Sequence, residues 1–254
     1  MTLFMQSGLV LNMIGLCKFC KKNFHKREKT RKFCCLDCSS RFNRNGLRKI
    51  YLPVLSPDLA EFIGIMLGDG GLTDFQCTVY LNSETDQYFA YYVRELVLKL
   101  FGLTPKIYVH RKHKVWRVSI SSVSLVKYLI SRGLTTGSKV DLQAAVPDWI
   151  WLNTDYIKSC VRGLIDTDGS FVIHKYKVRQ KEYSYAKISF TNRSKPLIDF
   201  VYQALNKLGF NPKKSYKDQV WLHRQGEVRK YLEEIGVNNY RPNVISLGWV
   251  ARVV

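Results

Sequence analysis

Two aspartates stand at corresponding places in two similar stretches of the chain, residues 59–70 and 156–169. Asp69 and Asp168 each follow an apolar run of helical length and precede a glycine, a residue that ends many helices because it tolerates a positive φ angle. A carboxylate at a helix C-terminus meets the negative end of the helix dipole and is locally unfavourable. Because both stretches break the same rule, we interpret the two aspartates as parts of one functional site.

Small residues recur one helical turn apart in both stretches: Gly64 and Gly68, then Gly163 and Thr167. Residues at i and i+4 share one helix face, so each predicted helix carries a narrow seam that another backbone can approach. Two helices packed along these seams would bring the two aspartates side by side. Carboxylates that close favour a bound cation, and oxygen ligands favour a hard ion such as Mg²⁺.

The same order of elements follows each aspartate and predicts the fold class. Strand signals, a long amphipathic helix, two more strands and a shorter helix come after each of the two apolar stretches. This order predicts an α+β fold with two pseudo-symmetric half-domains of order αββαββα. The predicted strands are 78–82, 107–111, 115–121, 171–177, 183–191, 213–216 and 219–224, and the predicted helices are 83–101, 123–132, 194–208 and 225–235.

The two stretches resemble a known pair of signature helices. Phe-Ile-Gly-Ile-Met-Leu-Gly-Asp-Gly at 62–70 and Val-Arg-Gly-Leu-Ile-Asp-Thr-Asp-Gly at 161–169 are similar to the motifs of the LAGLIDADG homing endonucleases. The resemblance covers about residues 53–254. It implies a monomeric, single-chain enzyme of a mobile intron with internal pseudo-two-fold symmetry. It also implies Mg²⁺-dependent hydrolysis of both strands of a long asymmetric DNA target, which leaves short 3′ overhangs.

The resemblance further implies the metal ligands and catalytic residues. Asp69 and Asp168 would hold Mg²⁺, with help from the backbone carbonyls of Gly68 and Thr167. The family places polar or basic residues at the end of the strand that follows each signature helix.

In the second copy Asn192 and Arg193 match that position and are expected to take part in catalysis. In the first copy the matching residues are Ser83 and Glu84, a departure that predicts two chemically unequal halves. Members of the family also use a lysine on the last strand of each half. In this chain the nearest positions carry other residues, so no catalytic lysine is assigned.

The charge of the chain points to a polyanionic partner. Lys and Arg number 40 against 20 Asp and Glu, a formal net charge of +20, with normal hydrophobic content. Nucleic acid is the first candidate and an anionic membrane surface the second. No apolar run is long enough to span a bilayer, and no signal-peptide pattern precedes Met13, a possible internal start. We therefore expect an intracellular protein that binds double-stranded DNA, not a membrane.

Five of the seven cysteines fall within residues 17–38. Closely spaced cysteine pairs predict a structural Zn²⁺ site, with a disulfide cluster as the alternative. Three ligands are evident, Cys17, Cys20 and Cys38. Simple C-x-x-C spacing favours Cys35 as the fourth. However, Lys-Phe-Cys-Cys-Leu-Asp-Cys resembles half of the small zinc fingers of mobile-element nucleases, and that match favours Cys34; His25 is a more distant candidate.

The predicted organisation has four parts: a zinc-finger-like module with a basic linker (1–50), a first half-domain (51–135), a linker (136–153) and a second half-domain (154–254). Each sheet would pack helices on one face and leave the other free to read base edges in the major groove. The expected DNA-contacting residues are Arg41, Arg44 and Arg48 in the module; Tyr80, Asn82, Lys106, Tyr108, His110, Arg111, Lys114, Arg117 and Ser119 in the first half; Lys139 in the linker; and Lys175, Lys177, Arg179, Lys181, Lys187, Ser189, Lys213, Lys214, Lys217, His223 and Arg224 in the second half.

A binding protein on the same scaffold is the alternative to a nuclease. It would be an RNA maturase that helps an intron fold, or a DNA-binding regulator that no longer cuts. The presence of both aspartates favours cleavage, and no helix-turn-helix pattern supports the regulator.

Overall fold

The computed structural model describes residues 13–26, 28–45, 49–215 and 218–242. The chain divides into two compact units, 1–48 and 49–254. In the first unit, β1 (Met13–Leu16) pairs antiparallel with β2 (Asn23–Lys26), and α1 (Leu36–Asn45) follows. Among the described residues of this small unit, the only buried hydrophobic side chains are those of Cys17 and Cys38. The unit therefore has almost no apolar core of its own.

The second unit contains the two half-domains. The first consists of α2 (Pro57–Gly68), β3 (Gly70–Leu72), β4 (Gln76–Asn82), α3 (Gln87–Phe101), β5 (Lys106–His110), β6 (Val115–Ser121) and α4 (Val123–Ser131). The second consists of α5 (Thr154–Asp168), β7 (Gly169–Val178), β8 (Lys181–Thr191), α6 (Lys195–Lys207), β9 (Lys213–Ser215), β10 (Gln219–Leu222) and α7 (Gln225–Glu234). The predicted αββαββα order is confirmed in both halves. A short 3₁₀ helix, η2 (Asp148–Leu152), precedes α5.

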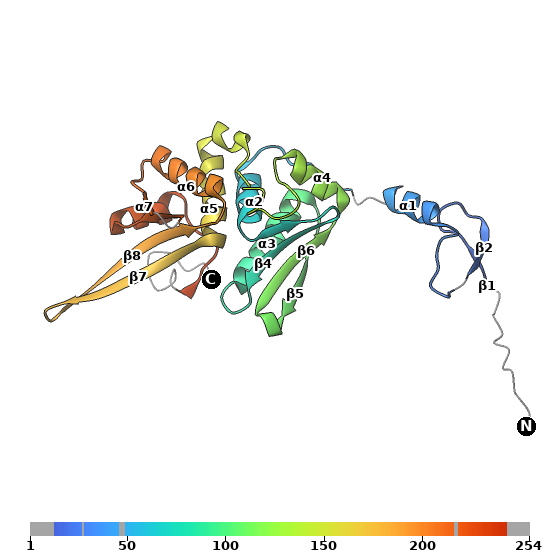
Figure 1. The fold of residues 1–254 in the computed structure, drawn as a ribbon, viewed down its shortest axis with the longest axis horizontal. Helices are drawn as coiled ribbons and strands as arrows, with labels where there is room; N and C mark the ends of the chain where they lie inside the picture. The colour runs from blue at the N-terminus through green and yellow to red at the C-terminus, as the bar shows by residue number, and fades with distance from the viewer. Residues whose placement is uncertain (1–12, 27, 46–48, 216–217, 243–254) are drawn as a thin grey trace, which may run out of the picture. The chain divides into compact units, whose positions relative to one another are not determined.

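Each half-domain has one four-stranded antiparallel sheet, in the order β3-β4-β6-β5 or β7-β8-β10-β9. The helices lie on one side of the sheets, and the α2–α5 pair stands between the two sheets (Figure 1). Alternate strand residues face those helices and form the core, as Cys77, Val79 and Leu81 do in β4. No helix in the described part of the chain combines the length and apolar character needed to cross a membrane.

Two local predictions about the first half-domain differ from the structure. The predicted order requires a strand before 78–82, but no residue range was predicted for it, because the Gly-Gly-Leu sequence of β3 carries little strand propensity. Helix α3 begins at Gln87 and not at residue 83, because Asn82 starts a turn. The side-chain oxygen of Asn82 accepts a hydrogen bond from the backbone N–H of Glu84 (2.8 Å). Asp86 then accepts the backbone N–H of Asn82 (3.2 Å) and delays the helix by one turn.

Candidate active site

The two signature helices touch backbone to backbone along the predicted seam. A Cβ atom added to Gly64 would lie 2.4 Å from the carbonyl oxygen of Cys160, and one added to Gly163 would lie 2.4 Å from that of Glu61. At the ends of the helices, a Cβ on Gly68 would lie 2.0 Å from Thr167 Oγ1 and 3.3 Å from Asp168 Oδ2. Only glycine permits this approach, which brings the last turns of α2 and α5 together.

The glycines after the two aspartates have a different role from the one predicted. Neither Gly70 nor Gly169 has a positive φ angle, and the chain passes directly from each helix into a strand. A Cβ on Gly70 would lie 2.5 Å from the Met66 carbonyl oxygen, and one on Gly169 would lie 2.3 Å from that of Ile165. These glycines are therefore required because the strand folds back closely on the last helical turn.

Asp69 and Asp168 lie half-buried at the paired helix ends. Burial and the neighbouring Asp168 carboxylate together raise the pKa of Asp69 to about 7. Burial also raises the pKa of Asp168, although Asn192 Nδ2 donates a hydrogen bond to Asp168 Oδ2 (2.8 Å) and opposes the shift. Two desolvated carboxylates that repel each other form a donor set suited to a divalent cation with oxygen ligands.

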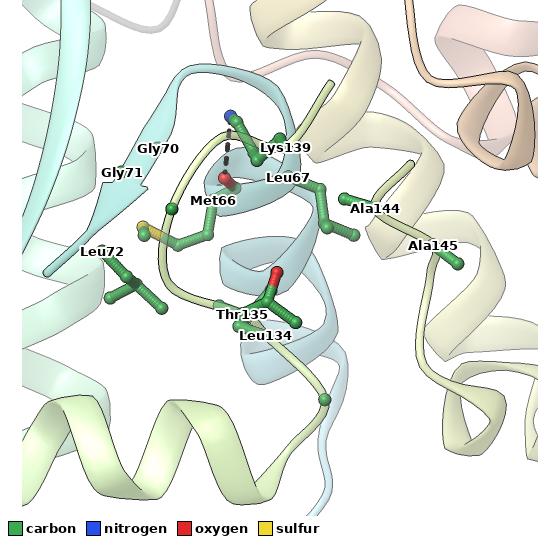
Figure 2. A pocket seen from close by; sticks show the side chains of 12 residues that line it. Met66, Leu67, Gly70, Gly71, Leu72, Leu134, Thr135, Lys139, Ala144 and Ala145 are labelled. Carbon is green, nitrogen blue, oxygen red and sulfur yellow. Dashed lines mark hydrogen bonds between the residues drawn. The ribbon is translucent and has the colours of Figure 1, made fainter. Parts of the chain in front are cut away.

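Two basic residues hold the carbonyl ends of the signature helices, and this arrangement was not predicted. Lys139, in the segment after α4, donates a hydrogen bond to the carbonyl oxygen of Met66 (3.3 Å; Figure 2) and another to that of Gly68. Burial lowers the pKa of Lys139, and the Asp168 and Asp69 carboxylates oppose that shift. The linker around Lys139 also encloses a small cavity of about 40 Å³ against the end of α2.

Arg241, in the segment after α7, has the corresponding place in the second half. Its guanidinium donates to the carbonyl oxygens of Asp166 (3.2 Å), Thr167 (3.3 Å) and Gly169 (3.1 Å). Positive charge at a helix C-terminus offsets the dipole that makes a carboxylate unfavourable there. Lys139 and Arg241 therefore stabilise the helix ends on which the two aspartates stand.

This arrangement shows the contacts of three residues for which the sequence predicted other roles. Lys139, expected to contact DNA, is bonded to backbone atoms inside the protein. The carbonyls of Gly68 and Thr167, expected to help hold Mg²⁺, accept hydrogen bonds from Lys139 and Arg241. A carbonyl oxygen has two lone pairs, so each of these oxygens keeps an acceptor site beside the carboxylates. No motif surrounds Arg241 in the sequence, so only the fold could reveal its position.

The residues beside the two aspartates differ between the halves. Asn192 contacts Asp168, as predicted, and the exposed Arg193 lines the same open cleft. In the first half, Glu84 forms an ion pair with Lys114 (2.7 Å). Lys114, expected to contact DNA, is thus paired with an acidic neighbour. Strand register places Leu81 and Asn82, and not Ser83 and Glu84, at the positions of Asn192 and Arg193, because Val79 pairs with Gly70 as Phe190 pairs with Gly169. The two halves therefore differ at other residues than those predicted.

Residues 155–236 match the family model described as the LAGLIDADG-like domain. The second half-domain is therefore similar to the LAGLIDADG-like domain. The matched residues begin at the start of α5, include Asp168 and Asn192, and end just after α7.

Solved structures of similar fold span both halves. I-DmoI in complex with DNA and Ca is 18% identical, covering 76% of this chain and 97% of that chain, with a TM-score of 0.49. The LAGLIDADG meganuclease I-AabMI bound to uncleaved DNA is 11% identical, covering 76% and 88%, with a TM-score of 0.49. Full-length DUF199/WhiA from Thermatoga maritima is 14% identical, covering 78% and 63%, with a TM-score of 0.48. At these values the likeness concerns the fold alone.

The outer face of the first sheet carries the residues predicted for it. Strand register aligns Tyr80, Arg117 and Tyr108 in one row, and Asn82 and His110 fall in the next row. Ser119 and Lys106 share a third row, but Ser119 is buried and hydrogen-bonds Thr78 Oγ1 (3.0 Å). Because Ser119 is covered by its neighbours, its hydroxyl is not free to meet a base.

In the second half-domain the predicted residues divide between the two faces of the sheet. Register places Ser189 and Lys213 on the outer face beside Trp221, and Lys187 follows in the next row. Ser189, however, is buried. His223 stacks on Trp221 (centroids 5.4 Å apart, 5° between planes).

Lys175, Lys177 and Lys214 have the opposite register, so they occupy the other face of the sheet from Lys187 and Lys213. Lys214 forms an ion pair with Asp199 and lies 4.9 Å from the ring centroid of Tyr202, both on α6.

The remaining predicted DNA contacts lie at turns or in the first unit. Arg179 and Lys181 are at the β7–β8 turn, and Arg224 is exposed just before α7. Arg41 forms an exposed ion pair with Asp37 (2.9 Å). The side chains of Arg44 and Arg111, and all of Arg48 and Lys217, lie outside what the structure describes.

Four cysteines of the first unit form a candidate metal centre. The sulfur atoms of Cys17, Cys20, Cys34 and Cys38 all lie within 4.8 Å of one another. The Sγ atoms of Cys20 and Cys34 are 3.6 Å apart, and those of Cys34 and Cys38 are 3.4 Å apart. Tetrahedral zinc with bonds of about 2.3 Å separates its sulfur ligands by roughly 3.8 Å, so the cluster fits that ion.

The fourth cysteine of the cluster is Cys34. Cys35 is exposed and accepts a hydrogen bond from the backbone N–H of Cys38 (3.4 Å). His25 lies on β2, opposite Ile14, and does not belong to the cluster. All seven cysteines are unpaired in this structure.

Proposed function

We propose that the chain is a site-specific endonuclease that hydrolyses both strands of a long asymmetric DNA duplex with Mg²⁺ and leaves short 3′ overhangs. The observation that carries this proposal is the pair of carboxylates, Asp69 and Asp168, held together where α2 and α5 end. The match of residues 155–236 to the LAGLIDADG-like domain supports it. The two sheets flank this helix pair (Figure 1), so one chain offers a reading face for each half of an asymmetric target, and we propose that it acts as a monomer.

In this proposal each residue of the site has a definite task. Asp69 and Asp168 bind Mg²⁺ through carboxylate oxygens, and the bound cation would supply the polarisation of a phosphoryl oxygen and the activation of water that phosphodiester hydrolysis needs. Asn192 fixes the orientation of the Asp168 carboxylate through its hydrogen bond to Oδ2. Lys139 and Arg241 keep the two helix ends in place. The charge of Arg241 is balanced by its ion pair with Asp86 (2.9 Å), so Lys139 is the residue of the two that would add positive charge near the scissile phosphate.

The contacts around the aspartates support unequal cleavage of the two strands. Arg193 is exposed in the cleft beside Asp168 and can contact a phosphate. Strand register places Leu81 and Asn82 at the matching positions of the first half, and neither side chain carries a positive charge. We therefore propose that the strand nearest Asp168 is cut faster than the other.

The first unit is proposed to bind one structural Zn²⁺ through Cys17, Cys20, Cys34 and Cys38. Thiolate ligation would replace the apolar core that this unit lacks. Its basic side chains would then extend phosphate contacts along the DNA flank.

The experiment that tests the proposal is a selection of cleaved sites from a randomised duplex library with the full-length protein and Mg²⁺. The expected result is one long, non-palindromic consensus, cut on both strands with a 3′ overhang of fixed length. Recovery of no cleaved product, from protein that nevertheless enriches a bound DNA sequence, would overturn the nuclease proposal and favour a regulator on the same scaffold.

A further inference from the structure

The outer part of the β7–β8 hairpin extends beyond the rest of its sheet. Strand β8 pairs with β10 only through Ile188–Thr191, whereas its pairing with β7 continues to Lys181. Residues 172–187 therefore form a two-stranded ribbon, which projects from the second half-domain (Figure 1). Residues 174–184 are exposed on both faces of this ribbon. The first half-domain has no equivalent, because β3 is only three residues long.

One face of the ribbon carries four aromatic side chains. Register pairs His174 with Tyr185 and Tyr176 with Tyr183, so all four share the face that bears Lys187 and Lys213. The Tyr176 ring stacks with both Tyr183 (centroids 5.3 Å apart, 17° between planes) and Tyr185 (5.5 Å, 6°). Tyr176 is 41% exposed and Tyr183 is 37% exposed, so this block of parallel rings faces solvent.

The side chains on this face are unsuited to reading base edges in a duplex. Bidentate recognition of guanine or adenine in the major groove requires Arg, Lys, Asn or Gln. The first sheet presents such residues on its outer face, as Arg117 and Asn82 illustrate. On this face of the ribbon the four aromatic positions are one His and three Tyr, and these side chains instead offer ring faces and hydroxyl groups.

The charges around the rings complement a phosphate backbone. Within residues 171–190 there are five Lys and Arg and only one acidic residue, Glu182. Lys187 shares the face of the rings, and Arg179 and Lys181 lie at the turn of the ribbon. Lys175 and Lys177 lie on the opposite face, where Lys177 forms an ion pair with Glu182 (3.9 Å). An exposed aromatic block bordered by basic side chains is the arrangement by which proteins hold unpaired nucleotides, with bases stacked on rings and phosphates held by cations.

We propose that the Tyr176–Tyr183–Tyr185 block binds unpaired bases of a single-stranded nucleic acid. The segment would lie along the ribbon, with bases stacked against the tyrosine rings and phosphates near Lys181 and Lys187, which share the alternation of Tyr183 and Tyr185 along β8. This binding does not depend on the aspartates or on cleavage, so it stands or falls separately from the nuclease proposal. Cross-strand aromatic pairs also stabilise an isolated ribbon. The test must therefore separate binding from folding.

Binding is measured by fluorescence anisotropy with the full-length protein, labelled oligo(U) and oligo(dT) of about 12 nucleotides, and a mixed-sequence duplex of about 30 base pairs. The test variant is Tyr176→Leu/Tyr183→Leu, and Tyr176→Phe/Tyr183→Phe retains the rings. The matched control is Tyr80→Leu/Tyr108→Leu, which removes two exposed tyrosines from the outer face of the first sheet. Circular dichroism and melting establish that each variant is folded.

The Leu variant is expected to bind the single strand roughly ten-fold to a hundred-fold more weakly, while its duplex affinity stays within about two-fold. The Phe variant should retain single-strand binding, and the Tyr80→Leu/Tyr108→Leu control should lose duplex binding only. Comparison of oligo(U) with oligo(dT) identifies the preferred sugar. Unchanged binding of both single strands by the Leu variant, or an equal loss of duplex binding, would overturn the proposal.

A second measurement on the unaltered protein covers the case in which the Leu variant does not fold. Ultraviolet cross-linking to an oligonucleotide that contains 5-iodouracil, followed by peptide mapping, should label Tyr176, Tyr183 or Tyr185. Cross-links found only on other segments would reject the ribbon as the binding surface.

Discussion

Glu61 on α2 accepts a hydrogen bond from Arg162 on α5, and this ion pair joins the two half-domains across their helix seam. Glu61 is fully buried and also accepts hydrogen bonds from Tyr92 (2.7 Å) and Asn238 (2.6 Å). The pseudo-symmetry relates Glu61 to Cys160 and Arg162 to Ile63, so it generates no second ion pair of this kind. It therefore distinguishes the two halves and specifies how they assemble.

Removal of one partner should destabilise the protein strongly. Arg162→Met leaves the Glu61 carboxylate buried without its cation, and the free energy of unfolding should fall by about 3–5 kcal/mol. Urea denaturation measures this decrease. The control is Lys158→Met, which removes the longer, partly exposed pair with Glu234 (3.9 Å) and should cost less than about 1 kcal/mol. Equal effects of the two substitutions would contradict the role of Glu61–Arg162.

The raised pKa of Asp69 predicts how pH acts on the metal-free protein. Its folded-state pKa, about 7, lies above the ordinary value of 3.8, so the folded state binds the proton more tightly than the unfolded state does. The contribution of Asp69 to stability is therefore most favourable at low pH and is lost as pH rises from about 4 to about 7. Asp69→Asn should flatten this part of the stability profile in urea denaturation. An unchanged profile would show that Asp69 is not desolvated in this way.

Metal binding should follow the opposite trend, because the cation competes with the proton for the same carboxylate. The affinity for Ca²⁺, which is expected to bind without supporting cleavage, should rise as pH approaches about 7 and then level off. Isothermal titration calorimetry between about pH 5.5 and about pH 8.5 measures it. A Ca²⁺ affinity that does not vary across this range would argue against Asp69 as a ligand.

The choice between two adjacent cysteines gives a sharp test of the zinc centre. Cys34 belongs to the group of four close sulfur atoms, and Cys35 does not. Metal analysis of reduced protein should find about one zinc per chain in the unaltered protein and in Cys35→Ser, and much less in Cys34→Ser. Absence of zinc from Cys35→Ser alone would assign the fourth ligand to Cys35.

The first unit is expected to strengthen DNA binding without choosing the cleavage site. A truncated protein that begins at Lys49 should cut at the same position but bind more weakly. The slope of log affinity against log salt should become shallower by about 0.9 for each phosphate that the truncated protein no longer neutralises. Footprinting of both proteins at matched salt is the measurement. An identical footprint and salt slope would limit the unit to a role in stability.

Much of the site could be predicted because its signals are local. The spacing of Gly64, Gly163 and the two aspartates is set by one helical turn, and the cysteine pairs are set by two short turns. The basic residues that cap the helices could not be found in this way. Lys139 and Arg241 reach the ends of α2 and α5 from loops about 70 residues further along the chain, and nothing in their own sequence marks that contact.

The face of each strand residue was predicted less well, for a reason of register. The two-residue turn between β7 and β8 pairs Val172 with Lys187, so even-numbered residues of β7 share a face with odd-numbered residues of β8. Lys175 and Lys187 therefore lie on opposite faces of the sheet, although both are odd-numbered and a simple alternation along the sequence would place them on the same face. Only the observed pairing resolves this point.

The central claim is that Asp69 and Asp168 together perform metal-dependent cleavage of both DNA strands. The most direct test is Asp168→Asn, compared with Asp155→Asn at the exposed N-terminal end of the same helix. With Mg²⁺ and the duplex recovered by selection, Asp168→Asn should reduce double-strand cleavage by at least roughly a thousand-fold, because a ligand of the metal that activates water is removed. Its binding of that duplex in Ca²⁺ should remain within a few-fold, and Asp155→Asn should cleave normally. Full double-strand cleavage by folded Asp168→Asn would contradict the account.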